Sequence, residues 1–201
     1  MKALYHFVVK LEKTHHDTIE LENGTVLHVD PKWKEFERRV MYGEVTSTPV
    51  KYDVDVEVGD TLFFHHHVVM SDALKVEVND EQRFIVGYDP ENTLSCHAIA
   101  YRSKKTGELH MLADWVFLQP IEEEKKKDSE IIEIVDLKPK THLKAKVFCC
   151  PKGMITQGVK PGDIVGFKQN RDYEMKLEDE TVVFRMRSED MMYVQSQDAV
   201  S

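Results

Sequence analysis

Short runs in which apolar and polar residues alternate dominate the chain, and they predict β-strands. The runs cover Leu4–Leu11, Val40–Thr46, Val54–Val58 and Leu74–Val78. An apolar side chain at every second position is typical of a strand with one buried face. No helical stripe exceeds about two turns, although the spacing of Trp33, Phe36 and Val40 allows a short helix after Pro31. Many short strands separated by turns indicate an all-β barrel or sandwich.

One succession of motifs occurs twice along the chain. A Gly59-Asp60 turn leads into an apolar strand in the first part, and Gly162-Asp163 does the same in the second. Hairpins follow at residues 75–81 and 175–180, and closing strands at residues 114–119 and 190–195. We interpret this order as an internal duplication of one β-module. The expected domains are residues 1–121, with an inserted hairpin at about 90–110, and residues 130–201, joined by a charged linker at 122–129.

A long polar segment, about residues 13–39, separates the first two expected strands and carries the apolar run Gly24-Thr25-Val26-Leu27. Segments of this length without secondary structure are uncommon in compact domains and are usually functional. Two interpretations of the run remain open. Its side chains either form another core strand or stay exposed for a partner.

Composition narrows the classes of function. The net charge of −9 argues against nucleic-acid binding, because phosphate recognition needs a positive surface. No apolar run is long enough for a membrane span, and the first residues lack a signal-peptide core. Three cysteines without a CxxC spacing indicate a reducing compartment, so we expect a cytoplasmic protein.

The ordered motifs resemble the GroES-type co-chaperonin family. The first strand at Leu4–Leu11, the run Gly24–Leu27, the strand Tyr42–Val45 and the turn Val56–Asp60 follow the order of that family. The resemblance implies two GroES-like β-barrels in tandem and a ring-forming lid that caps an ATP-driven chaperonin. It implies that Gly24, Thr25, Val26 and Leu27 form the anchor of a mobile loop that binds the GroEL-like ring. Client proteins would fold inside the cage.

The second module departs from the family pattern. Residues 131–137 pass through Lys138–Thr141 directly into Leu143–Cys149, so we expect this module to lack the mobile loop. If only the first module carries an anchor, matching a sevenfold chaperonin ring implies a homoheptamer. An unusual lid of this kind would suit a phage-encoded protein in the host cytoplasm. No cofactor is expected, because ATP would be hydrolysed by the partner.

A rival interpretation is a cupin-like metal-dependent enzyme that uses His65, His67 and His110. In a strand His65 and His67 share one face and His66 takes the other. A cupin-type site also needs a glutamate shortly after the second histidine, and Met70, Ser71 and Asp72 occupy that region. We therefore expect no metal and no enzyme.

Two further points complete the sequence prediction. Cys149 and Cys150 are adjacent, so strand alternation places them on opposite faces. No nucleophile elbow, phosphate-binding loop or dinucleotide fingerprint is present in the sequence. A third interpretation of the whole chain is a structural virion-assembly protein that has the same barrel but does not bind a chaperonin.

Overall fold

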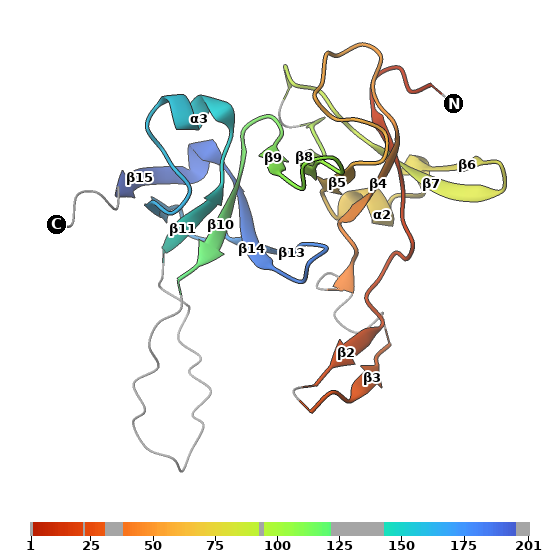
Figure 1. Cartoon of the computed structure of the whole chain (residues 1–201), viewed down its shortest axis with the longest axis horizontal. Helices are drawn as coiled ribbons and strands as arrows, with labels where there is room; N and C mark the ends of the chain where they lie inside the picture. Colours follow the sequence, from red (N-terminus) through yellow and green to blue (C-terminus); the bar gives the residue numbers. More distant parts are fainter. Residues whose placement is uncertain (1, 22, 31–37, 93–94, 122–142, 196–201) are drawn as a thin grey trace.

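The computed structural model describes residues 2–21, 23–30, 38–92, 95–121 and 143–195. Two antiparallel sheets, of seven and six strands, dominate these residues, and a separate two-stranded hairpin projects from the first sheet (Figure 1). The predicted all-β class is confirmed. The short helix expected after Pro31 lies outside the described residues.

The strand order of the first sheet is β6-β7-β1-β4-β5-β8-β9. The bounds are β1 Phe7–Lys10, β4 Tyr42–Ser47, β5 Thr61–Phe64, β6 Lys75–Val78, β7 Glu81–Val86, β8 Ala98–Arg102 and β9 Leu109–Met111. Two short helical segments, α2 His67–Met70 and η1 Asp72–Leu74, connect β5 to β6. Alternate residues of these strands, such as Val9, Val45 and Phe64, fill a core that belongs to this sheet alone.

The strand order of the second sheet is β13-β14-β10-β11-β12-β15. The bounds are β10 Trp115–Pro120, β11 Lys144–Cys149, β12 Ile164–Phe167, β13 Tyr173–Lys176, β14 Val182–Arg187 and β15 Met191–Gln195, with α3 Lys152–Thr156 and η3 Ser188–Asp190 between strands. Val116, Leu118 and Phe167 belong to a second core formed by this sheet.

The two sheets share one topology. Read in order, β6, β7, β1, β4, β5 and β8 correspond to β13, β14, β10, β11, β12 and β15. The irregularities also match: the register shifts between Phe63 and Phe64 where β5 meets β8, and between Gly166 and Phe167 where β12 meets β15. Within the first sheet, only β9 lacks a counterpart among the described strands of the second. The duplication inferred from the sequence is present in the strand order.

The limits of the repeated unit differ from the prediction. Residues 114–119 were expected to close the first module, but β10, Trp115–Pro120, is hydrogen-bonded between β11 and β14 as the second sheet's equivalent of β1. The closing strand of the first unit is β8, which the prediction had placed in an insertion. The sequence could not settle this assignment because both faces of β10 are apolar. Trp115 and Phe117 face the first sheet, while Val116 and Leu118 face the second core.

The assignment of β10 to the second sheet also bears on the charged run at residues 122–129, which was expected to link the two domains. With β10 as first strand, the next described strand is β11, and residues 121–143 separate the two in the sequence, as residues 11–41 separate β1 from β4. The expectation that the second module lacks the mobile loop concerns residues 131–141, which lie outside the described residues, as does the run at 122–129.

The two Gly-Asp turns have the same geometry. Gly59 and Gly162 adopt φ values of 96° and 100°, which favour glycine. In the first turn the buried Asp60 carboxylate accepts a bond of 2.8 Å from the amide of Glu57; in the second, Asp163 accepts one of 2.8 Å from the amide of Lys160. The run Val54–Val58 leads into the first turn and contains no strand. Its alternation was misleading.

Apolar side chains also fill the junction between the two sheets. The cluster contains Met41, Phe63, Ile99 and Ala100 from the first sheet and Trp115, Phe117, Met175, Leu177 and Val183 from the second. Phe63 and Phe117 meet edge to face, with ring centroids 6.2 Å apart at 88°. A dry contact of this kind holds two sheets as one body.

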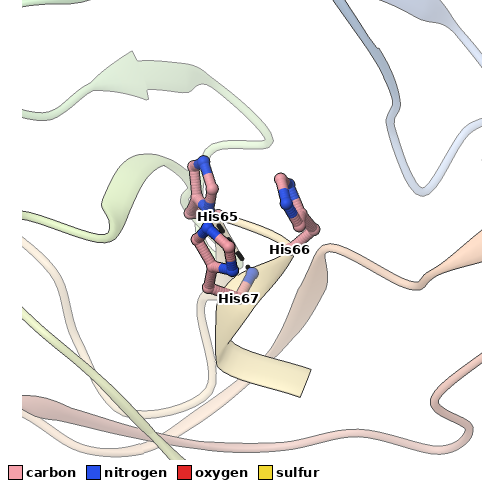
Figure 2. A group of neighbouring side chains, drawn as sticks. All are labelled: His65, His66 and His67. Atoms are coloured by element: carbon pink, nitrogen blue, oxygen red, sulfur yellow. Dashed lines mark hydrogen bonds between the residues drawn. The ribbon is translucent and has the colours of Figure 1, made fainter. Parts of the chain in front are cut away.

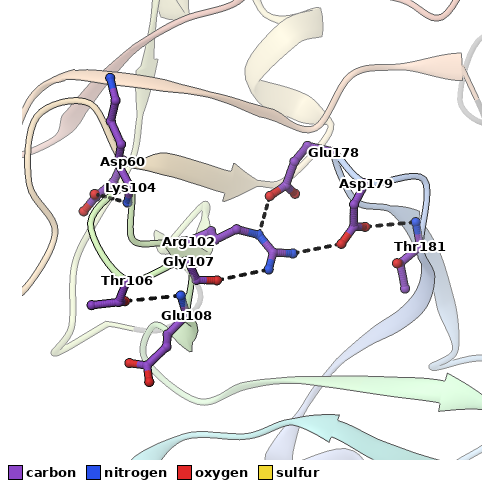
Figure 3. A network of polar contacts seen from close by, with 9 residues as sticks. All are labelled: Asp60, Arg102, Lys104, Thr106, Gly107, Glu108, Glu178, Asp179 and Thr181. Atoms are coloured by element: carbon purple, nitrogen blue, oxygen red, sulfur yellow. Dashed lines mark hydrogen bonds and ion pairs between the residues drawn. The ribbon is translucent and has the colours of Figure 1, made fainter.

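The Gly-Asp turns provide a test of the repeat. Asp60 holds a second amide, that of Lys104, at 2.9 Å (Figure 3). Because each lost hydrogen bond costs about 1 kcal/mol, we expect Asp163→Ala to lower the free energy of unfolding by about that amount and Asp60→Ala by about twice as much. Urea titration measures both. The exposed Asp172→Ala should stay within about 0.5 kcal/mol of wild type; equal losses at Asp60 and Asp163 would contradict this account.

Candidate functional site

A β-hairpin projects from the first sheet and is the first candidate. Strands β2, Thr18–Glu20, and β3, Val26–His28, pair with each other and with no other described strand. Backbone bonds at the base join the two arms, from the amide of His16 to the carbonyl of Arg38 at 2.7 Å and from Val40 to Thr14 at 3.0 Å. Figure 1 shows the hairpin extending away from both sheets.

The tip of this hairpin is determined by local sequence. Gly24 has a φ of 77°, a conformation that glycine adopts without a side-chain penalty. The Asn23 side-chain oxygen accepts the amide of Thr25 at 3.0 Å, and the amide of Gly24 donates to the carbonyl of Leu21 at 2.8 Å. Such a bond from an asparagine to the backbone two residues on is typical of tight turns.

The apolar side chains of the hairpin are exposed. Val26 is 54% and Leu27 is 45% exposed, and the neighbouring Leu21 is exposed as well. None of the apolar clusters among the described residues includes them. Of the two interpretations of this run, the structure provides no burial for a core strand. It presents a small apolar surface at the end of a projecting arm.

The three consecutive histidines form the second candidate. His65 follows β5, and His67 begins the short helix α2. The chain turns at this point, so strand alternation fails and all three imidazoles come together, with one nitrogen of each within 4.8 Å of the others. His65 and His67 stack with centroids 4.6 Å apart, and the His67 amide donates to Nδ1 of His65 at 3.3 Å (Figure 2).

The cluster lies at the junction of the two sheets. His66 stacks on Tyr173 of β13, with centroids 5.3 Å apart and an interplanar angle of 8°. The guanidinium of Arg185, on β14, lies over two aromatic rings. Its Cζ is 4.1 Å from the ring centroid of Tyr173 and 5.4 Å from that of Trp115. A histidine of the first sheet thus contacts an aromatic and cationic surface of the second.

These surroundings favour the neutral form of His65 and His66. Burial, followed by the charge of Arg185, lowers the pKa of His65 to about 2. Burial, followed by His67 and Arg185, lowers the pKa of His66 to about 4. Burial also lowers the pKa of the adjacent His97, whose carbonyl accepts the amide of His65 at 2.9 Å.

The cluster is a poor match for the metal site considered from the sequence. His110 lies on β9 with its ring stacked 5.0 Å from that of Tyr101, and it is not a member of the cluster. Nδ1 of His65 already accepts a backbone amide, and the nearby guanidinium of Arg185 would repel a cation. Neutral imidazoles ligate metals readily, but the contacts present here are those of packing at a junction.

The cysteines give no sign of a nucleophile. Cys149 contacts the cluster between the sheets and Cys150 the second core, so the predicted opposite faces are confirmed. Burial raises the pKa of Cys149 to about 11, and its Sγ lies 3.4 Å from the carbonyl oxygen of Leu109. A thiol held protonated is a weak nucleophile. Both cysteines line an open cleft of about 520 Å³ between the sheets, along with His110.

Comparison with known proteins identifies no family for this chain. No family model matches the sequence, and no curated protein matches it. Among the described residues, no helix has the length and apolar character needed to cross a membrane.

We expect purified protein to contain no stoichiometric transition metal, because the cluster lacks a carboxylate and faces Arg185. Elemental analysis after purification without an affinity tag tests this. His65→Ala with His67→Ala should fold as a β-protein by circular dichroism. About one zinc, iron or manganese per chain, lost in the double variant, would contradict the expectation and revive the enzyme interpretation.

Acid should weaken the junction. The pKa of His66 lies below its ordinary value of 6.5 in the folded protein, so between pH 6.5 and about 4 the unfolded chain binds a proton that the folded chain does not. Stability should therefore be complete above pH 6.5 and fall with pH, by at most about 1.4 kcal/mol per pH unit for each such histidine. Urea titrations across this range should give a shallower slope for His66→Gln, whereas the exposed His28→Gln should keep the wild-type slope.

Proposed function

We propose that the protein is a co-chaperonin, a lid that caps an ATP-driven chaperonin ring and assists protein folding. The observation that carries this proposal is the apolar pair Val26 and Leu27, exposed near the end of a hairpin that projects from the first sheet. Neighbouring apolar side chains that stay exposed and join none of the apolar clusters of the described residues are typical of a surface that binds a partner. The occupant that suits it is an apolar groove on the chaperonin ring.

The repeated module supports the same proposal. Each sheet has the topology of the other, and we identify both with the GroES-like barrels that the ordered motifs indicate. The hairpin occupies the connection between the first two strands of its unit, which is where the resemblance places the mobile loop. Gly24 and Thr25 form its turn, and Val26 and Leu27 are its anchor.

The energetics favour weak, reversible contacts. Burying Val26 and Leu27 contributes about 1.5–3 kcal/mol each. Fixing backbone residues costs about 1–2 kcal/mol each, but the paired hairpin has already fixed much of its backbone. One anchor still binds weakly, and several anchors on one assembly raise the affinity through effective concentration. The lid would act in the cytoplasm, with the partner hydrolysing ATP.

Fewer observations support the two rival functions. The cupin-like enzyme needs His110 beside His65 and His67, and the described structure separates it from them. A structural virion protein would use the same exposed pair in its own assembly, and a chaperonin-binding experiment distinguishes it from a lid.

The test uses Val26→Asp with Leu27→Asp and a purified GroEL-type chaperonin ring with ATP. We expect wild type to co-sediment with the ring and the double variant to lose at least tenfold in affinity. The melting temperature should change by less than about 2 °C, because exposed side chains contribute little to folding.

Val50→Asp with Ile155→Asp is the matched control, since both residues are exposed and lie away from the hairpin. This variant should bind as wild type does. Failure of wild type to bind any ring would overturn the proposed function. Binding by the hairpin variant at wild-type affinity would overturn the assignment of the anchor.

A further inference from the structure

The contact between the two sheets joins two different faces of a repeated unit. The first sheet contributes a surface on β4, β5 and β8, here called the tail face: Met41, Phe63, Ile99 and Ala100. The second contributes a surface on β10, β13 and β14, here called the head face: Trp115, Phe117, Met175, Leu177 and Val183. Because the unit is repeated, the second sheet has a tail face of its own, and the first sheet has a head face of its own.

Register identifies the tail face of the second sheet. Phe63 pairs with Ala100 directly before the register shift, and Gly166 pairs with Tyr193 at the same place. Ile99 therefore corresponds to Met192. Met41 corresponds to Leu143, because their carbonyls accept the equivalent amides of Phe64 and Phe167. The tail face of the second sheet therefore consists of Gly166, Met192 and Tyr193, while Leu143 packs against the second core.

This second tail face is uncovered. Ile99 and Ala100 are fully buried at the junction, whereas Met192 is 55% and Tyr193 is 46% exposed. Each unit has one aromatic residue in this strand pair. In the first unit it is Phe63, on β5, and in the second it is Tyr193, on β15, the counterpart of β8. Tyr193 lies over Gly166, where an added Cβ would come within 2.2 Å of the ring. The exchange of large and small residues keeps an aromatic surface on the face.

The first sheet presents the matching head face. Phe84 and Phe184 lie opposite Val9 and Leu118 in the equivalent strand pairs, so Arg83 corresponds to Val183. Val76 pairs with Arg83 as Met175 pairs with Val183, and Val78 follows in the position of Leu177. Val76, Val78 and Arg83 are all partly exposed, whereas Val8, the counterpart of Phe117, is already buried within the chain.

The two uncovered faces lie at opposite ends of the molecule. In Figure 1 β15 forms one end and the β6–β7 hairpin the other, and the β13–β14 hairpin points from the second sheet toward the first. We infer that a second copy of this chain docks its head face on the exposed tail face at β15, so that the contact between chains repeats the contact within the chain. A contact between different faces closes into a ring or continues as a filament.

Polar contacts at the junction indicate how strong the repeated contact is. Arg102 of β8 makes ion pairs with Glu178 and, at 3.2 Å, with Asp179, both in the turn between β13 and β14 (Figure 3). In the repeated contact Gln195 takes the place of Arg102, because Arg102 pairs with the first residue of β5 and Gln195 with the first residue of β12. Asn79 and Asp80, in the turn between β6 and β7, take the places of Glu178 and Asp179. A neutral glutamine replaces the arginine and an amide replaces one of the two carboxylates, so the ion pairs are lost and the contact between chains is weaker than the one within the chain.

The inference deepens the proposed function, on which its biological use rests: both modules of each chain occupy positions in the lid, and the anchors of several chains act together. Here that module provides the surface that receives the next chain.

The test uses one variant on each face. Met192→Asp blocks the tail face and Val76→Asp blocks the head face, each by burying a charge in an apolar contact. Native mass spectrometry and light scattering should show an oligomer for wild type and a monomer for either variant. A mixture of the two variants should form a one-to-one dimer and nothing larger, because each chain retains one of the complementary faces.

Val50→Asp with Ile155→Asp, outside both faces, should assemble as wild type. If Val76→Asp fails to fold by circular dichroism, Val78→Asp replaces it. A monomeric wild type at micromolar concentration would overturn the inference. So would variants that assemble normally, or a mixture that forms no dimer.

Assembly and chaperonin binding are separable. Val26→Asp with Leu27→Asp should assemble as wild type while losing the chaperonin. Wild type that assembles without binding a chaperonin overturns the proposed function and leaves this inference standing. Wild type that binds as a monomer overturns this inference alone.

Discussion

The apolar contact between the two sheets is the interaction on which the rest of the structure depends. Phe63 and Phe117 meet edge to face at its centre, within a cluster drawn from both sheets. Each sheet also has a core of its own. The junction therefore adds a third core that fixes how the two units are placed, and with them the hairpin, the histidines and the uncovered face at β15.

The histidines show what that placement does to chemistry. Three imidazoles and an arginine in one place resemble a reactive site, yet their contacts are those of packing: His66 stacks on Tyr173, and Arg185 covers the same ring. Burial and the positive charge of Arg185 lower the pKa values of His65 and His66 and so favour their neutral forms. A junction of this kind tolerates neutral pH well and resists the uptake of protons.

The two repeated units agree in some features, such as the Gly-Asp turns, and differ in others, such as the position of the aromatic residue on the tail face. The Gly-Asp turns retain the same buried carboxylate and the same amide bond, because a buried backbone amide needs an acceptor. The aromatic residue of the tail face has moved from Phe63 in one unit to Tyr193 in the other. The pair of strands needs one large and one small side chain, and either strand can supply the large one.

The sequence by itself determined the all-β class, the repeat and the tight turns. Alternating apolar positions and residues such as Gly59 and Asn79 act locally, so their effects can be read without the fold. It also singled out Val26 and Leu27, whose exposure the alternation alone could not predict.

The tertiary structure decided which strands belong together. Both faces of β10 are apolar, and a strand of this kind can join either sheet until the hydrogen-bonded neighbours are known. That one assignment moved the limit of the repeated unit. The tertiary structure also brought His65, His66 and His67 together, because the chain turns into α2 where strand alternation would have separated them. Pairing and turning are set by contacts between distant residues, and a pattern along the chain does not contain them.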